Sequence, residues 1–298
     1  MKKYLMILFV AVMSVMLVVP AFAAEGATGD KITTPSGAEI NLTNWDSFAA
    51  VPVGDTGFFW IDPGCAGAVA EIKASSNDAN AKSVYYTTDP TCMYINVALN
   101  PTHGAGYADF VNNRGDSGIG ANTKAIVMRV KTNREILFGL NGNIWDGGSA
   151  KGCQLAATGD PIWLVDAETS LVKNAKIHTD KFRNTVVIPG GFDGFLVLPT
   201  SRIATEMTWT NNEPDGPATV GNWNSGALAG FVHFWQWFTY FQQTGDSAAT
   251  IEIMDMYVVN ETLPTLADED YATADVSVIA YAVAAITGLG ALVVAKKR

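Results

Sequence analysis

Short runs of β-branched and aromatic residues, separated by clusters of Gly, Asn, Asp and Pro, are the feature that most limits how this chain can fold. Between the two ends, no stretch of convincing length has helical periodicity. Runs of this kind are typical of β-strands, so the pattern predicts an all-β protein. About nine strands, the number seen clearly, suffice for a two-sheet β-sandwich or jelly roll. The runs are 83–87, 93–99, 125–131, 135–140, 162–165, 185–188, 195–198, 231–241 and 250–259.

Apolar segments at the two ends predict export and membrane attachment. Residues 1–23 start with Lys2 and Lys3, continue through an apolar stretch and close on a small-x-small pattern, as a signal peptide does. Residues 276–295 carry no charge and precede a basic tail, as a transmembrane helix does. An uncleaved anchor and a buried core helix are the respective alternatives. The expected organisation is a signal peptide 1–23, a β-sandwich ectodomain 24–261, an acidic linker 262–275, a transmembrane helix 276–295 and a cytoplasmic basic tail 296–298.

The charge and the cysteine count narrow the choice of partners. Without the five basic residues at the two ends, 14 basic side chains stand against 29 acidic ones, a net charge of about −15. A field of this sign repels phosphate backbones, so no nucleic acid is expected as a partner. Cys65, Cys92 and Cys153 match no zinc pattern. In an oxidising compartment they allow one disulfide at most and leave one thiol.

The C-terminal segment "TADVSVIAYAVAAITGLGALVVAKKR" resembles the anchors of surface proteins from Gram-positive, clostridia-like bacteria. In those anchors a Thr-Gly-Asp element precedes the apolar span, and Thr273, Ala274 and Asp275 stand at that place. Leu263 and Pro264 supply only the first two letters of a sortase signal. The resemblance therefore implies a secreted ectodomain, extracellular and held at the cell membrane by a retained helix.

Two internal segments, "VVIPGGFDGFLVLPTSRI" (186–203) and "ATIEIMDMYVVN" (249–260), resemble galactose-binding-like jelly rolls, the fold of many carbohydrate-binding modules. Members often have a pair of acids where this chain has Asp255 between two Met residues. The resemblance implies a jelly-roll fold and glycan binding. Many such domains carry a structural Ca²⁺, for which Asp255 or Glu252 with backbone carbonyls would serve.

Tryptophan in polar surroundings suggests where a sugar could be held. A pyranose offers an apolar face for an aromatic ring and a rim of hydroxyl groups for hydrogen bonds. Trp145, Trp209 and Trp223 lie in "NGNIWDGG", "EMTWTNNEPDG" and "GNWNSG", which a core would not easily explain. Each could instead fold over the edge of the sandwich and cover a loop.

The stretch "FVHFWQWFTYF" (231–241) divides into two faces by strand alternation. The more hydrophobic even face, with Phe234, Phe238 and Tyr240, is expected to pack between the sheets. The odd face, with His233, Trp235 and Trp237, is expected to bind a glycan, unless both faces are covered. These alternatives stay open in the sequence.

Strand 125–131 alternates in the same way. Ile126, Met128 and Val130 share one face, and Arg129 lies on the other. If this strand lay beside the aromatic stretch, Arg129 could donate to a sugar beside Trp235 or Trp237. The alternative is a solvated face that pairs with the acidic excess.

Three functions follow in order of preference. The first is a non-catalytic cell-surface protein that stacks polysaccharide on aromatic side chains. The second is a structural or adhesive surface protein with no glycan site, and the third is a polysaccharide-degrading enzyme. Spacing nominates no pair of catalytic carboxylates, and no metal or nucleophile motif is present in the sequence.

Overall fold

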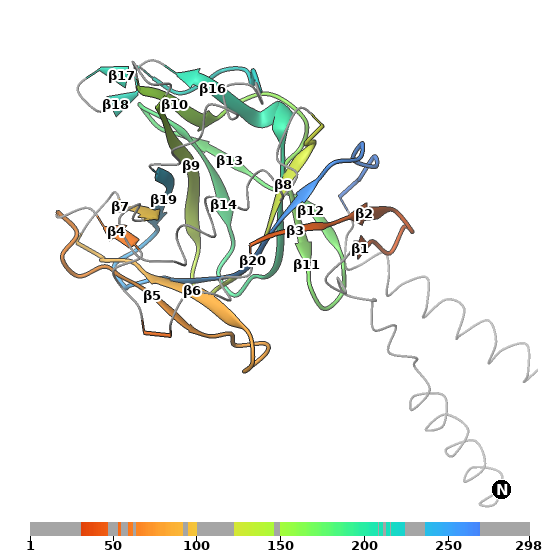
Figure 1. The fold of residues 1–298 in the computed structure, drawn as a ribbon, viewed down its shortest axis with the longest axis horizontal. Helices are drawn as coiled ribbons and strands as arrows, with labels where there is room; N and C mark the ends of the chain where they lie inside the picture. The colour runs from red at the N-terminus through yellow and green to blue at the C-terminus, as the bar shows by residue number, and fades with distance from the viewer. Residues whose placement is uncertain are drawn as a thin grey trace, which may run out of the picture.

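The computed structural model describes residues 31–46, 53–54, 59–61, 64–91, 95–99, 122–145, 150–207, 209–210, 213–214, 216–223 and 236–268. These residues form twenty β-strands and one 3₁₀ helix, η1 (Thr200–Arg202) (Figure 1). The strands are β1 (Lys31–Thr33), β2 (Glu39–Asn41), β3 (Thr43–Asp46), β4 (Phe59–Ile61), β5 (Val69–Ala74), β6 (Lys82–Thr87), β7 (Ile95–Leu99), β8 (Ala125–Thr132), β9 (Ile136–Trp145), β10 (Ala150–Leu155), β11 (Trp163–Asp166), β12 (Val172–Asn174), β13 (Ile177–Thr179), β14 (Asn184–Ile188), β15 (Asp193–Pro199), β16 (Ile203–Met207), β17 (Trp209–Thr210), β18 (Glu213–Pro214), β19 (Gln236–Gln243) and β20 (Thr250–Val259).

Two eight-stranded antiparallel sheets organise these strands. The first, which we call the β8 sheet, has the order β12-β11-β15-β8-β20-β6-β5, and β3 pairs with β20 as well. The second, the β9 sheet, has the order β13-β14-β9-β19-β7-β4, with β10 between β9 and β16. The pairs β1-β2 and β17-β18 form two small sheets of their own. The expected all-β sandwich is thereby confirmed.

A shared apolar core lies between the two large sheets. Alternate residues of a strand lie on the same face, so each sheet contributes one face to this core. The central strands β8 and β9 supply side chains that are at most 4% exposed: Ile126, Met128 and Val130 from β8, and Ile136, Phe138 and Leu140 from β9. The expectation that Ile126, Met128 and Val130 share one face of their strand is confirmed.

A second apolar cluster covers part of the other face of the β8 sheet. The β1-β2 hairpin places Ile32 and Ile40, both at most 1% exposed, against this face. The segment after β20 returns along it, and its Leu263 and Leu266 pack onto the same cluster. The side chain of Asn41 donates to Glu261 at 2.8 Å, which joins the hairpin to this segment. Part of the expected acidic linker 262–275 is therefore packed against the domain.

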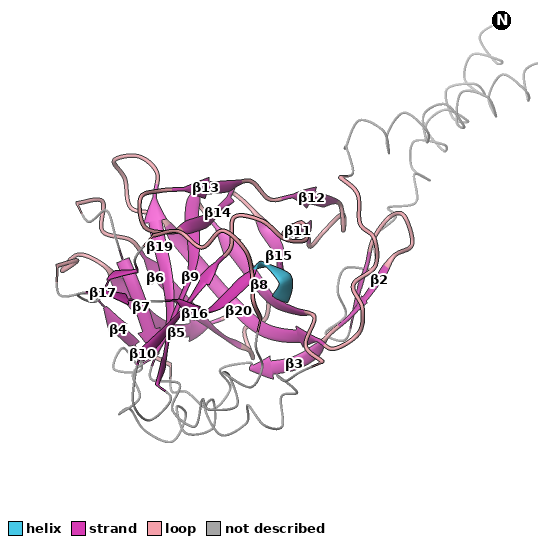
Figure 2. Ribbon diagram, turned by 90° about the horizontal axis from the view of Figure 1, so that it is seen from above, coloured by secondary structure: helices cyan, strands magenta, loops and turns pink. Residues whose placement is uncertain are grey.

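The hairpin and the outermost strands of the β9 sheet lie far apart. In both views β2 lies at one end of the molecule, and β4 and β7 lie at the other; Figure 1 also shows β1 beside β2 (Figures 1 and 2). The described chain both begins and ends at the hairpin end, because Leu266 shares the apolar cluster of Ile32.

Each of the nine expected strands overlaps a strand of the structure, although β19 begins at Gln236 and residues 231–235 lie outside the described residues. The predicted signal peptide 1–23 and transmembrane helix 276–295 also lie outside them. In the part of the chain that the structure describes, no helix has the length and apolar character needed to cross a membrane.

Candidate functional site

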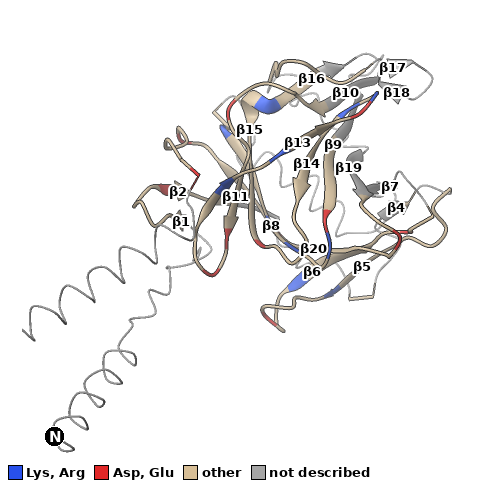
Figure 3. Cartoon of the chain, turned by 180° about the vertical axis from the view of Figure 1, so that it is seen from behind, with Lys and Arg blue, Asp and Glu red and all other residues tan. Residues whose placement is uncertain are grey.

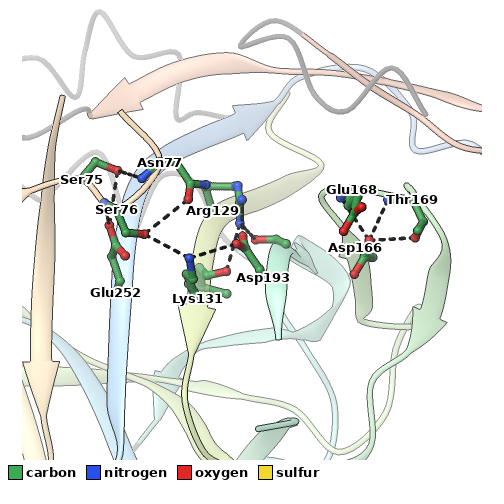
Figure 4. A network of polar contacts seen from close by, with 12 residues as sticks. Ser75, Ser76, Asn77, Arg129, Lys131, Asp166, Glu168, Thr169, Asp193 and Glu252 are labelled. Carbon is green, nitrogen blue, oxygen red and sulfur yellow. Dashed lines mark hydrogen bonds and ion pairs between the residues drawn. The ribbon is translucent and has the colours of Figure 1, made fainter. Parts of the chain in front are cut away.

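Arg129 lies in a network of charged residues on the outer face of the β8 sheet, the face away from the shared core (Figure 4). It forms an ion pair with Asp193 of β15, and its Nη1 donates to the carbonyl of Gly194 at 3.1 Å. The guanidinium also lies 5.2 Å from the ring centre of Phe195. Only 8% of Arg129 is exposed. Because protein groups already surround the guanidinium, Arg129 is poorly placed to bind a sugar.

The expected pairing of Arg129 with the aromatic stretch is wrong. β8 belongs to the β8 sheet, whereas β19 lies in the β9 sheet between β9 and β7. The sequence left two roles for Arg129: donating to a sugar, or pairing with an acidic residue on a solvated face. The structure shows the ion pair with Asp193, but Arg129 is buried and not solvated.

Glu252 of β20 holds the turn between β5 and β6. Its carboxylate is almost fully buried and accepts from the Ser76 backbone N–H at 2.9 Å and the Ser75 hydroxyl at 3.3 Å. Burial alone would raise the pKa of Glu252, but hydrogen bonding to its carboxylate, first of all from Ser76, outweighs burial and lowers that pKa. Glu252 is therefore a buried ionised carboxylate with protein donors around it.

The Glu252→Gln variant is expected to lower the free energy of unfolding by about 1–3 kcal/mol, because a buried donor loses its charged acceptor. The folded-state pKa of Glu252 lies below its unfolded value. Its stabilisation is therefore fully present above the unfolded pKa of about 4.3 and disappears as the pH falls through the folded pKa. Urea unfolding at pH 7 and pH 3 should show a difference between wild type and variant that shrinks in acid.

The control for this prediction is Glu71→Gln. Glu71 pairs with Lys73, whose side chain is 49% exposed, so its loss should cost less than about 1 kcal/mol. Equal stabilities of wild type and Glu252→Gln at pH 7 would contradict the role given to Glu252.

The surroundings of Glu252 and Asp255 do not fit the expected Ca²⁺. The strand register places Lys131 opposite Glu252 and Arg129 opposite Asp255. Burial raises the pKa of Asp255, and the hydrogen bond with Tyr257 and the charge of Arg129 offset part of this effect. Among the described residues, no group of three or more His, Cys, Asp or Glu could hold a metal ion. A Ca²⁺ site needs several oxygen ligands around the ion. Here a cationic residue, Lys131 or Arg129, stands opposite each carboxylate instead.

The register of β19 shows which of its positions lie on the core side of the β9 sheet. Phe241 pairs with Phe138 and Thr239 with Leu140, and both partners belong to the shared core. Directly opposite residues of an antiparallel pair share a face. The odd positions, including Trp237, therefore lie on the core side, and the even positions lie on the outer side. The expectation from the sequence was the reverse, while His233 and Trp235 lie outside the described residues.

The outer side of the β9 sheet brings together aromatic and amide positions from four strands. Ile61 packs against the shared core, so its neighbour Trp60 falls on the outer side. Asn96 pairs with Tyr240, and Asn141 pairs with Phe238. We call this set the aromatic–amide face. Its members are Trp60, Asn96, Asn141, Asn143, Trp145, Gln236, Phe238 and Tyr240.

The three tryptophans that the sequence suggested for sugar binding, Trp145, Trp209 and Trp223, lie in different parts of the fold. Trp145, at the end of β9, belongs to the aromatic–amide face. Trp209 pairs with Pro214 in the small β17-β18 sheet. Trp223 is half-buried against the shared core, and within the described part of the chain its buried indole N–H has no hydrogen-bond partner. Trp60 was not among the residues expected from the sequence.

No protein-family model and no curated protein matches the chain. Among solved structures, it is similar to the family 11 carbohydrate-binding module of the cellulosomal cellulase Lic26A-Cel5E of Clostridium thermocellum, with 11% identity, 78% of this chain and 98% of that chain covered, and a TM-score of 0.37. A family 11 carbohydrate-binding module from Clostridium thermocellum in complex with a β-1,3-1,4-mixed-linked tetrasaccharide gives 11% identity, 74% of this chain and 96% of that chain covered, and a TM-score of 0.37. The cellulose-induced protein Cip1 gives 12% identity, 71% and 95% coverage and a TM-score of 0.29. At these TM-scores the similarity is one of broad outline.

Proposed function

We propose that this protein is a non-catalytic carbohydrate-binding protein and that polysaccharide binds at the aromatic–amide face. The observation that carries the proposal is the register of β19 on β7 and β9, which gathers Trp60, Phe238 and Tyr240 with Asn96 and Asn141. Aromatic rings suit the apolar face of a pyranose, and amides both donate to and accept from its hydroxyl groups. This combination of residue types is the one that the recognition of a sugar requires.

The proposed surface has a limit on one side. Leu137 lies on the outer side of β9 but is only 6% exposed, so that end of the face is covered. The loop that carries Ala218 covers β10 and β16, because the Ala218 N–H donates to Gln154 and Ala218 packs against Ala204. The surface proposed for the ligand therefore extends from Gly139 along β9 and across β19 and β7 to β4.

Native gels cast with glucans, mannans or pectin test the proposal on the purified protein in detergent. A polysaccharide that binds should retard the protein in a saturable manner. The Tyr240→Ala and Trp60→Ala variants should bind about 5-fold to 30-fold more weakly, as expected when a central aromatic residue is truncated.

Tyr85→Ala is the matched control, because Tyr85 lies on the outer face of the other sheet, opposite Glu252. It should bind like wild type. If no polysaccharide retards the wild-type protein, the structural or adhesive function replaces the present proposal. A loss of the polymer during incubation would instead favour an enzyme.

We also propose that the protein is secreted and held at the cell membrane of a Gram-positive, clostridia-like bacterium, with the ectodomain outside. The end segments 1–23 and 276–295 support this localisation by their sequence alone. In a bacterial host, a mature N-terminus at Ala24 and recovery in the membrane fraction are expected. A protein that keeps Met1 and stays in the soluble fraction would contradict this localisation.

A further inference from the structure

The four strands of the aromatic–amide face contain no charged residue and no histidine. β4, β7, β9 and β19 comprise 3, 5, 10 and 8 residues, 26 in all. About half of these residues lie on the core side, and because 16% of the whole chain is charged, about two charges would be expected among the outward positions. By contrast, charged residues lie in β5, β6, β8, β15 and β20 of the β8 sheet, several of them visible along β5 and β6 (Figure 3).

An anionic sugar would find no cationic side chain within the four described strands of this face. Removing a carboxylate or sulfate from water is costly unless a positive charge or several donors replace the water. Several cationic side chains of the described chain are already paired: Arg129 with Asp193, Lys73 with Glu71 and Lys31 with Glu39. The whole chain also carries a formal net charge of −10, which repels a polyanion.

A cationic sugar would likewise find no carboxylate there. The polar residue types at the outward positions of the four described strands are Asn and Gln amides, the Tyr hydroxyl and the indole N–H of Trp. Amides and hydroxyls are uncharged donors and acceptors, and they complement uncharged hydroxyl groups.

The spacing of the aromatic positions indicates a chain of sugars and not a single one. Trp60 pairs with Ala98, and Tyr240 pairs with Asn96 two residues further along β7. With strands ~4.8 Å apart and a rise of ~3.4 Å per residue, the two aromatic positions are ~12 Å apart. This separation exceeds the width of one pyranose ring, so only an extended ligand reaches both.

Resting on the proposed function, we propose that the ligand of the aromatic–amide face is a neutral polysaccharide, bound through several consecutive uncharged sugar units. Such binding releases few ions, so added salt should change it little. Polymers of uronic acids and sulfated or phosphorylated polysaccharides should be rejected.

A matched pair of polymers tests this proposal on the full-length protein. Native gels contain either a neutral glucan that retards the wild type or the same glucan after carboxymethylation. Each gel is run at low salt and with 0.5 M NaCl added, which shortens the Debye length to about 4 Å. The expected result is retardation by the neutral polymer at both salt concentrations and at least 10-fold weaker retardation by the carboxymethylated polymer. The free monosaccharide should not compete at concentrations at which a short oligosaccharide does.

The outcomes separate the two proposals. Equal binding of both polymers, preference for the charged one, or loss of binding in salt would overturn the neutral-ligand proposal and leave the proposed function standing. If no neutral or charged polysaccharide retards the protein, the proposed function itself fails.

Discussion

The Phe138→Ala variant is expected to lower the free energy of unfolding by about 3–5 kcal/mol. Phe138 is 1% exposed and lies in the core between the two sheets. It also sits in the central strand of the β9 sheet, opposite Val186 on one side and Phe241 on the other. Its removal leaves a cavity in a region that cannot easily collapse. Urea unfolding followed by tryptophan fluorescence gives the measurement.

Phe182→Ala is the control for this change. Phe182 lies in the turn between β13 and β14 and is half-buried, with the amino group of Lys181 4.7 Å from its ring centre. Its truncation should cost about 1 kcal/mol or less. If both variants unfold at the same urea concentration, the two sheets do not share the core described above.

The Cys65→Ser variant should lower the free energy of unfolding by about 2–4 kcal/mol, because Cys65 is disulfide-bonded and 1% exposed. A separate contact joins this loop to the region after β6, where Asp89 accepts from the Gly67 N–H at 2.9 Å. Chemical unfolding with and without reductant measures the effect. Reductant should lower the stability of the wild type to that of the variant and leave the variant unchanged.

Thiol counting provides the control. The chain has three cysteines, so one bridge leaves one titratable thiol in unfolded wild type and two in Cys65→Ser. Three thiols in unreduced wild type, or an unfolding midpoint that reductant does not move, would contradict a disulfide at Cys65.

The strands and the fold class could be predicted because their signals are local. In β8, apolar residues occupy both faces because the shared core covers one face and the hairpin cluster covers part of the other. This gives a nearly continuous apolar run with a single Arg at its centre. The short strands β1, β2, β12 and β13 have three residues each, too few for a recognisable pattern.

The binding face could not be predicted, since it depends on the pairing of distant strands. Alternation divides 236–243 into two sets of residues but does not say which set faces the core. That choice is made by the register with β9, where Phe241 meets Phe138. Trp60 was overlooked because its three-residue strand joins the face only through β7.

The role of Arg129 was missed for the same reason. No local signal shows that β8 and β19 lie in different sheets, or that Asp193 comes to lie beside Arg129. The tail after β20 offered a weak sign, because Leu263 and Leu266 interrupt an otherwise polar segment, and both pack onto the domain.

The most direct test compares two phenylalanines of the same strand. Phe238→Ala changes the aromatic–amide face, and Phe241→Ala makes the same chemical change on the core side. Polysaccharide retardation and urea unfolding are measured for both. We expect Phe238→Ala to lose binding and unfold close to wild type, and Phe241→Ala to lose about 3–5 kcal/mol of stability and still bind while folded. If Phe238→Ala instead loses as much stability as Phe241→Ala and still binds while folded, this side of the sheet is core and the account is contradicted.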